Sequence, residues 1–460
     1  MRRNFSFKRH WTSYISSIKR YNWSFLIWTL IILEFIFLFL CIKSQTIIWI
    51  FLAIVNSLFI VYLSWKIFLI IIPILILFFA LFLYIDNINS LQEINANLIV
   101  SEKIGNGIIV NYENKKIFIK TNQIINQYDI AKINCKNVIK INSDNSFYKY
   151  LKSKNVNYVA ENSLIQVIGH KYSMKEDIFN YLSNGGAYYS RYVPLILLGK
   201  RYPKNDIILV KLQNISLIHL FTISGFHINI IIYIFEKIFL NLKIKNKYFH
   251  FLIYLFMILY ILILGMPIAA MRAFIFSFLC FINKKFLHKK FHTLNLLSIT
   301  MSIFFFINPY IVYSLSFVFT FLMTFVIILL NSFANLKYKK LKMIIFTWIM
   351  STMFNIYLNN EINFLSWLSN IFFTPIISFS YILTFFFFWL KPTLDNYYLI
   401  LDIMINMFQF IKLSINLNLD PNWLILFISF IYILLLIIAK KPMIKEHNTF
   451  LKFYNWTEFK

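Results

Sequence analysis

Polar and ionisable side chains stand close together in one otherwise apolar stretch, from Lys211 to His227. Its chemical groups include an amine, two imidazoles, amides and hydroxyls, among them His219 and Ser224. Polar groups at membrane depth are costly, so they usually face a bundle interior or a water-filled cavity. Gly225 allows the backbone to leave the helical conformation there. At membrane depth, non-helical backbone is tolerated only where protein or water surrounds it. The stretch predicts a pore-lining or re-entrant segment; the alternative is that both histidines lie at the interface and Ser224 bonds to its own helix.

A second unusual segment, residues 265–273 (GMPIAAMRA), opens another apolar run. Pro267 suits the first turn of a helix, where its missing N–H removes no hydrogen bond, and Ala269 and Ala273 form a small face that lets another helix approach. Arg272 lies about one turn inside this predicted helix. A guanidinium there could reach the outer interface, pair with a distant acid, or offer planar donors to phosphates. Because Arg272 is the last arginine of an arginine-poor chain, we favour a specific role for it.

Helix-breaking residues mark two further places. Asn308 and Pro309 stand at a tight connection between apolar runs. Asn370 and Pro375 interrupt the apolar run 364–390, which is longer than one straight span needs. We therefore expect that run to be divided into a half-helix and a helix. Other ionisable residues in or near apolar runs are expected to snorkel or to pair between helices: Glu34, Glu236, Asp402 and Lys412.

The sequence has no pattern for a nucleotide or metal site. Neither a Walker A sequence nor an HExxH zinc motif occurs, so the chain itself cannot couple ATP hydrolysis to transport. Cys41, Cys135 and Cys280 are far apart, which suggests neither a disulfide framework nor a metal-ligand cluster. We therefore expect no cofactor and no metal, and we expect that the chain is not an enzyme.

One enzyme class has a partial resemblance. Ser224 and Gly225 inside an apolar helix resemble the nucleophile region of rhomboid-type intramembrane serine proteases. Those enzymes have a glycine two residues before the nucleophile, where this chain has Thr222. The candidate bases, His250 and His292, fall at the predicted cytoplasmic ends of their helices, too far from a serine near the outer side. We therefore set this hypothesis aside.

The composition is that of a membrane protein. Of the 460 residues, 60% are apolar and only 14% are charged, whereas a soluble domain carries about a quarter charged residues. Many apolar runs are about 18 residues or longer, the length that crosses roughly 30 Å of hydrocarbon as a helix. These figures exclude a soluble enzyme and a disordered chain. The net charge of +27 fits either a polyanionic partner or basic cytoplasmic loops.

Positive charge and apolar runs together predict the topology. The first 23 residues carry several basic residues and no acid, so the positive-inside rule places the N-terminus in the cytoplasm. Three apolar runs follow: 24–42, 46–65 and 67–85. Nine more are predicted at 224–241, 249–265, 268–283, 293–308, 311–334, 341–358, 364–390, 398–418 and 422–440. Basic loops fall at alternate connections of this second block, which independently places the C-terminus in the cytoplasm. Much of the net charge is therefore a topology signal.

Between the two blocks the chain is polar. Alternating residues over 108–121 predict a β-hairpin, residues 130–141 predict a further strand, and residues 173–182 predict a helix that returns to the membrane. We predict an all-α polytopic membrane protein of about twelve transmembrane helices with an inserted small β domain. Its parts are a transmembrane block (1–85), an extracytoplasmic β domain with its linker (86–192), a block of about nine helices (193–440) and a cytoplasmic tail (441–460).

Several segments resemble one family in their order along the chain. The string HLFTISGFHI, from His219 to Ile228, resembles the competence-domain signature of the ComEC family, whose usual form is close to HLLAISGLHV. Other elements similar to that family are LILLGKR (195–201), GMPIAAMRA (265–273), Asn308–Pro309 with residues 314–317, and Asn370 to Pro375. Residues 147–157 (FYKYLKSKNVN) are similar to the linker after the family's OB-like domain.

The resemblance implies a plasma-membrane channel through which one DNA strand enters during genetic competence, with an OB-like fold for the β domain. It implies single-stranded DNA as partner beside the lipid bilayer, and a separate DNA receptor, nuclease and cytoplasmic ATPase or helicase. OB folds commonly bind single strands, and polar groups in the helices can line a hydrated, phosphate-tolerant path. The residues expected along the DNA path are His219, Ser224, Gly225, His227, Pro267, Arg272, Asn370 and Pro375.

The chain also departs from the family. Many members carry a C-terminal metallo-β-lactamase-like domain, whereas no His-x-His-x-Asp-His sequence occurs here, so nuclease activity is not carried over. The alternative function, of a different class, is a secondary transporter of a small anionic or lipid-linked substrate. An internal repeat between helical halves would favour the transporter, and the sequence shows none.

Overall fold

The computed structural model divides the chain into two compact units. One comprises Leu26–Glu176 and Met301–Val318 and is called the β unit; the other comprises Met1–Phe25, Asp177–Thr300 and Phe319–Lys460 and is called the bundle unit. The residues described are 24–44, 46–88, 93–123, 125–141, 145–161, 163–199, 206–215, 217–221, 223–243, 249–332, 345, 348, 349, 352, 361–363, 366–409 and 414–416. Each unit is described by itself.

Three of the described helices are long and apolar enough to cross a membrane. They are α2 (Ser24–Ser44) and α3 (Ile47–Ile88) at the start of the chain, and α15 (Ser366–Phe387) in the bundle unit. Most apolar side chains of α3 are exposed, as expected of a helix whose solvent is lipid. α3 is interrupted at Ser64, where the backbone is extended (φ −163°, ψ 99°) instead of helical. The protein is therefore a membrane protein.

A buried carboxyl group joins α2 to the first part of α3. Glu34 is 3% exposed, and its oxygens accept hydrogen bonds from the Asn56 amide (2.7 Å) and the Ser57 hydroxyl (2.8 Å). The Asn56 amide also donates to the backbone carbonyl of Leu30 (2.9 Å). The predicted helix pairing of Glu34 is thus confirmed.

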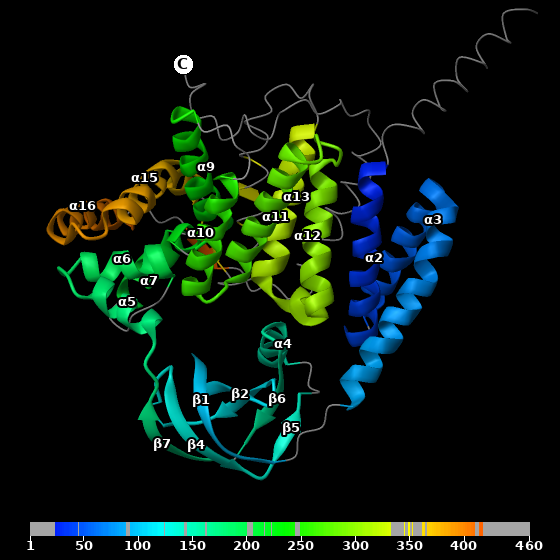
Figure 1. The fold of residues 1–460 in the computed structure, drawn as a ribbon, viewed down its shortest axis with the longest axis horizontal. Helices are drawn as coiled ribbons and strands as arrows, with labels where there is room; N and C mark the ends of the chain where they lie inside the picture. Colours follow the sequence, from blue (N-terminus) through cyan, green and yellow to red (C-terminus); the bar gives the residue numbers. More distant parts are fainter. Residues whose placement is uncertain are drawn as a thin grey trace, which may run out of the picture. The chain divides into compact units, whose positions relative to one another are not determined.

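Seven strands form one sheet in the order β5-β6-β3-β2-β1-β4-β7 (Figure 1). Their bounds are β1 Ile94–Ile104, β2 Gly107–Tyr112, β3 Lys115–Lys120, β4 Asp129–Cys135, β5 Val138–Lys140, β6 Val156–Ala160 and β7 Leu164–His170. The predicted hairpin is confirmed as β2 and β3, which pair antiparallel from Gly107–Lys120 to Tyr112–Lys115. The strand predicted over 130–141 is divided into β4 and β5 by two exposed residues, Lys136 and Asn137.

Because β4 and β5 are separate strands, one stretch of chain pairs at two different places in the sheet. β4 pairs with β1 and β7, whereas β5 pairs with β6, and β6 is parallel to β3. The sheet curls into a half-barrel. Alternate residues of each strand point into its apolar core, which includes Val100, Val110, Ile117, Ile119 and Ile133, all fully buried.

A short helix, α4 (Ser146–Ser153), packs against the 3₁₀ turn η2 (Pro309–Tyr313) within the β unit. The Asn308 amide nitrogen donates to the backbone carbonyls of Lys152 and Ser153, both at 3.1 Å, and its oxygen accepts from the Tyr310 N–H at 3.1 Å. The tight connection predicted at Asn308–Pro309 is therefore confirmed, and its asparagine also satisfies the last carbonyls of α4.

The bundle unit is helical. Its helices are α5 (Met174–Ser183), α6 (Tyr189–Leu198), α7 (Asp206–Asn214), α8 (Ile218–Phe221), α9 (Gly225–Asn241), α10 (Phe249–Leu264), α11 (Ile268–Lys285), α15 and α16 (Lys391–Gln409). Two more, α12 (Thr293–Ile307) and α13 (Leu315–Ser332), contribute residues to both units, as does α5, whose first three residues belong to the β unit. Within this unit α9, α10 and α11 pack on one another (Figure 1). Large fully buried rings fill its core, among them Tyr189, Tyr192, Tyr381, Tyr398 and Phe373.

One prediction about these helices is wrong. The run 364–390 is not divided at Asn370 and Pro375, because α15 continues unbroken from Ser366 to Phe387. The Thr374 hydroxyl donates to the carbonyl of Asn370 (2.5 Å), and α6 and α9 pack against the same helix. Side-chain hydroxyls and neighbouring helices are the usual means by which an apolar helix tolerates an internal proline.

The last predicted runs differ from what is observed or fall outside it. The run expected at 398–418 corresponds to α16, which begins earlier, at Lys391, and ends at Gln409. Strands β8 (Glu361–Asn363) and β9 (Ser414–Asn416) form a separate antiparallel pair. The predicted run 422–440 and the tail 441–460 lie outside the described residues, as does most of 341–358. The count of about twelve spans stays a prediction.

Candidate functional site

The most polar part of the predicted site forms the start of α9. This helix begins at Gly225, and Ser224 before it is extended (φ −116°, ψ 169°). The Ser224 N–H donates to Nδ1 of His227 (3.1 Å), and the Ser224 hydroxyl lies 3.0 Å from the same nitrogen. Because Nδ1 accepts from a backbone N–H, we assign the proton of the neutral ring to Nε2. The two side chains cap their own helix, which is the local alternative that the sequence left open for Ser224.

His227 is also part of the core between helices. Its side chain is 2% exposed, so it does not lie at an interface with water. Its ring meets that of Tyr381 on α15 edge to face, with centroids 4.4 Å apart. The Tyr381 hydroxyl in turn lies 3.3 Å from that of Tyr260 on α10, which donates to the carbonyl of Leu197 (2.8 Å). One ring contact and two hydroxyl contacts thus connect α9 through α15 and α10 to α6.

The serine–histidine distance also bears on the protease hypothesis. A nucleophile and its base must lie within hydrogen-bond reach, and Ser224 and His227 do. However, Nδ1 of His227 already accepts the Ser224 backbone N–H, so its lone pair is shared with a structural hydrogen bond. His250 stacks against Phe281 (centroids 6.0 Å), and His292 accepts the N–H of Leu294 (3.2 Å). We therefore assign capping and packing roles to these histidines.

Gly225 lies at a close contact between α9 and α11. A Cβ atom added to it would stand 2.8 Å from Nη2 of Arg272 and 2.9 Å from Cβ of Ala273. Carbon atoms do not approach so closely without displacing their neighbours, so only glycine fits. Ala269 and Ala273 are both buried, as the predicted small face requires. The Ser277 hydroxyl donates to the Asn229 side-chain oxygen and ties the same two helices further along.

Arg272 is held inside the bundle unit. Its side chain is 8% exposed, which rules out the interpretation that it reaches the outer interface. The guanidinium donates from Nη1 to the Thr324 hydroxyl, and its central carbon lies 5.7 Å from the centre of the Phe321 ring. Both partners are on α13. Because arginine is always protonated in proteins, this position holds a permanent positive charge next to the start of α9.

An ion pair between a buried aspartate and a half-buried lysine anchors the short helices that lead to α9. Asp402 on α16 is 6% exposed and accepts from the Tyr192 hydroxyl on α6 (2.7 Å) and from Lys211 Nζ on α7 (3.3 Å). The Asn406 amide also donates to it, at 3.1 Å. Helix pairing, predicted for Asp402, is confirmed. Lys211, the first residue of the polar stretch, is thus bound to a carboxylate.

A second aspartate of α16 caps α6. Oδ1 of Asp395 accepts the backbone N–H groups of Tyr188 (2.9 Å) and Tyr189 (2.7 Å). A Cβ atom at Gly186 would stand 2.2 Å from this carboxyl group, so the absence of a side chain there admits Asp395. A carboxylate at a helix N-terminus satisfies N–H groups that have no partner within the helix.

The other predicted site residues occupy separate positions. Pro267 precedes α11 directly, with extended backbone (φ −62°, ψ 138°), as predicted for a helix start. His219 lies on the one-turn helix α8, half-buried, and Asn370 and Pro375 lie within α15. Oδ1 of Asn370 is buried and has no hydrogen-bond partner among the described residues. The structure brings Gly225 to Arg272 and Ser224 to His227, and it leaves the others as separate predictions.

The sequence analysis missed the partners that α13 supplies to Arg272. Thr324 and Phe321 stand in a run of apolar residues and were not singled out. Thr320 and Thr324 are four residues apart, so two hydroxyls share one face of that apolar helix. This spacing was the available signal. Within the part of the chain that the structure describes, no three metal-ligating side chains come together.

The β unit contains a different polar cluster, centred on Asp86 near the end of α3. Its carboxyl group forms ion pairs with Lys43 of α2 (3.3 Å) and Lys140 of β5 (3.0 Å), and the Tyr310 hydroxyl lies 3.4 Å away. Lys43 also lies over the Tyr310 ring, 5.6 Å from its centre. The cluster therefore joins two apolar helices, the half-barrel and η2 within this unit.

His170, at the end of β7, lies between two carboxylates. Its Nδ1 is 2.8 Å from Asp129 and its Nε2 is 2.8 Å from Glu176 in the first turn of α5. The carboxylates of Asp129 and then Glu176 raise the pKa of His170 above its ordinary value of 6.5. The protonated ring thus bridges β4 to the first turn of the helix that follows the β domain.

Comparisons with known proteins give one family and one relative. Residues 196–442 match the family model described as "Competence protein". The chain is 29% identical over 191 residues to the "Uncharacterized protein MG316" of Mycoplasma genitalium. That match covers 41% of this chain and 49% of the relative, so it spans about half the relative's length. No solved structure matches the chain.

Proposed function

The chain belongs to the competence-protein family, and from that premise we propose that it is a membrane channel that imports single-stranded DNA. Family membership indicates a role in DNA uptake. The observation that carries the proposal is Arg272, a buried guanidinium held where α9 and α11 meet, inside the region that the family model matches. A guanidinium has five N–H donors in a planar fork that suits phosphate oxygens. The phosphodiester groups of a passing strand are the anions such a site attracts.

The β domain is proposed to be OB-like. The strand order supports this: β1, β2, β3, β6 and the joined β4 and β5 account for the five strands of an OB barrel. β7 is then an addition on β4. OB folds are partly open Greek-key barrels that commonly bind oligonucleotides, which suits a domain that first meets the incoming DNA.

The proposed topology has both termini in the cytoplasm and the β domain outside. The ion pair of Lys43 with Asp86 supports it, because it places the ends of α2 and α3 on the same side. An α3 that crosses twice, with its turn at Ser64, gives the three passes predicted from charge. The energy for DNA transport must come from another protein, so we propose a cytoplasmic ATPase or helicase as partner. A separate DNA receptor and a nuclease are proposed as further partners.

One observation favours the alternative, a secondary transporter. The short helices α7 and α8 precede α9, and Lys211 of α7 forms an ion pair with the buried Asp402. Discontinuous helices with ionisable groups are typical of transporter sites. The two functions can be separated by measuring the uptake of small anions by reconstituted vesicles. Under the transporter alternative, an Arg272 substitution that abolishes DNA import would leave this uptake unaffected.

Import of labelled DNA by a deletion strain tests the channel proposal. Complementation with the wild type should restore import, and Arg272→Ala should lower it by at least about tenfold, because a charge-assisted hydrogen bond is worth about 1.5–3 kcal/mol. Arg272→Lys keeps the charge without the planar fork and should be intermediate. Arg191→Ala is the matched control, since that arginine of α6 lies over the ring of Tyr188, the residue before the helix. Equal import by Arg272→Ala, at equal membrane levels, contradicts the assignment.

A further inference from the structure

Helix α4 of the β unit carries an unusual mixture of aromatic and basic residues. Its sequence, SFYKYLKS, includes Phe147 and Tyr150, which are 38% and 41% exposed. Residues three apart lie on the same face of a helix, so these two rings form one exposed aromatic surface. Beside this surface, Leu151 is fully buried one turn after Phe147, and the Phe147 ring also touches the Phe118 ring edge to face.

Positive charge surrounds this surface. Residues 145–157 contain three lysines and no acid, and Lys116 of β3 reaches the same place, with its Nζ 3.4 Å from the carbonyl of Lys154. Glu102 forms an ion pair with Lys154, so the group of four lysines is offset by one carboxylate here. Lys154 also lies 5.2 Å from the centre of the Tyr150 ring. Cations and rings are thus interleaved.

The surface is held rigidly. At the start of α4 the Asn145 side chain accepts the Phe147 N–H (3.2 Å), and at its end Asn308 binds two carbonyl groups. Lys149 and Lys152 lie over the rings of η2, at 5.7 Å from Tyr313 and 4.9 Å from Tyr310 respectively. A surface already fixed in one conformation loses little entropy when a ligand binds.

We propose that this face of α4, with Lys116, is a docking site for single-stranded nucleic acid. Bases stack on Phe147 and Tyr150, and Lys116 and Lys154 contact the phosphates, which is the usual combination in single-strand binding. Charge complementarity selects a polyanion, and stacking on side chains requires unpaired bases, so a single strand is preferred to a duplex. The inference rests on the proposed function and adds the place where the strand first binds.

Binding of a labelled oligothymidylate to the full chain in nanodiscs tests the aromatic part. Replacing Phe147 and Tyr150 together by leucine should weaken binding by roughly thirtyfold, because stacking contributes at least about fivefold for each base. Tyr150→Leu alone, which leaves the Phe147 contact with Phe118 intact, should weaken it less and guards against misfolding. Tyr172→Leu is the matched control, since Tyr172 is 77% exposed on the same domain.

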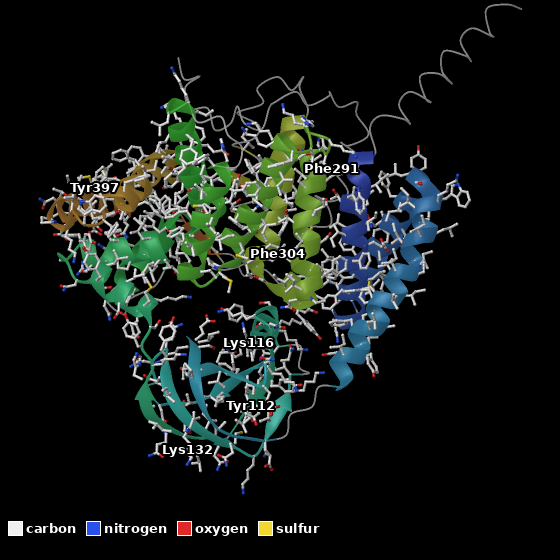
Figure 2. The ribbon with its side chains drawn as sticks, in the orientation of Figure 1. Tyr112, Lys116, Lys132, Phe291, Phe304 and Tyr397 are labelled. Atoms are coloured by element: carbon white, nitrogen blue, oxygen red, sulfur yellow. The ribbon has the colours of Figure 1, made fainter. Side chains whose placement is uncertain are left out.

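Salt dependence tests the lysines. Lys116→Gln should reduce the slope of log affinity against log salt by about 0.7, the value for one lost phosphate contact on a single strand. Lys132→Gln is the control: Figure 2 shows Lys116 on the α4 side of the sheet and Lys132 on the side away from it. Equal slopes for the two variants would overturn the phosphate contacts.

Three outcomes separate this inference from the proposed function. Unchanged affinity of the leucine variant, with normal DNA import by the wild type, overturns the docking site and leaves the channel. A wild type that neither binds the oligonucleotide nor imports DNA overturns both. A fluorophore on Tyr150→Cys, in a chain with Cys41, Cys135 and Cys280 replaced by serine, reports on lipid. Quenching by spin-labelled lipid with no response to the oligonucleotide shows that α4 binds the membrane and overturns the inference.

Discussion

The clusters around Asp86 and Arg272 differ in how far their charges are removed from solvent. The side chain of Asp86 is 22% exposed, and two lysines, Lys43 and Lys140, compensate its charge from neighbouring elements. Arg272 is 8% exposed and rests on a hydroxyl and an aromatic ring of α13. The ion pairs of Asp86 are sufficient to hold neighbouring elements together. Burial of the Arg272 charge costs desolvation free energy that a contact between two helices does not require.

The difference in desolvation indicates which cluster is retained for function. Burying a charge costs several kcal/mol, and apolar replacements of similar volume are often neutral or stabilising. A partly exposed ion pair, by contrast, contributes little in either direction. Replacing Arg272 should therefore change activity more than stability. The Asp402 carboxylate, which binds side chains of α6 and α7, should do the reverse.

The largest expected effect on stability is that of Asp402→Ala. It leaves the buried Tyr192 hydroxyl and the part-exposed Lys211 ammonium without their shared acceptor, and a buried group left unsatisfied costs about 1–3 kcal/mol, or more where the group is charged. Denaturant unfolding in mixed micelles measures this. The double variant Asp402→Leu with Lys211→Met removes both charges and should recover much of the loss. If the double variant is no more stable than the single one, the ion pair is not the cause.

Gly225→Ala should have the next largest effect. The new Cβ would stand 2.8 Å from Arg272 and 2.9 Å from Ala273, so the two helices must separate, and overpacking of this kind costs about 1–3 kcal/mol. DNA import should fall with it, because Arg272 moves. Gly169→Ala is the matched control, since a Cβ there meets nothing within 4 Å. A Gly225→Ala protein with wild-type stability and import would remove the close approach from the argument.

Local sequence signals predicted those parts of the fold that depend on neighbouring residues. The hairpin of β2 and β3, the start of α9 at Gly225 and the small face of α11 were all predicted this way. The break expected at Pro375 was wrong, because neighbouring helices and local hydroxyls maintain α15. Hydrophobic pattern and helix propensity do not reveal such support, since part of it comes from helices far away in the sequence.

The same limit applies to the site. Arg272 was singled out because arginine is rare in this chain. Its partners on α13 are about fifty residues further along, in a helix whose sequence is mostly apolar. Asn308 was singled out with Pro309 as a tight connection, and that was confirmed. Its bond to the end of α4 joins residues 156 apart in sequence. Nothing in the local pattern indicates which surface such an amide will meet.

Asp86→Asn tests the other half of the comparison. Because its ion pairs are partly exposed, the variant should lose at most about 1 kcal/mol of stability and keep most DNA import. Arg272→Met, by contrast, should keep stability and lose import. Thermal unfolding and the import assay on the same two proteins give the comparison directly. Loss of import in Asp86→Asn at unchanged stability would give this cluster the functional role assigned to Arg272.

The smallest expected effect is the pH dependence due to His170. Because Asp129 and Glu176 raise its pKa, the charged ring stabilises the folded β unit. This contribution is complete below the ordinary pKa of 6.5 and is lost as the pH rises through the higher pKa of the folded state. The difference in melting temperature between wild type and His170→Gln should therefore shrink as the pH rises from 6 to 9. A difference that grows with pH would show that the neutral ring is the form the fold prefers.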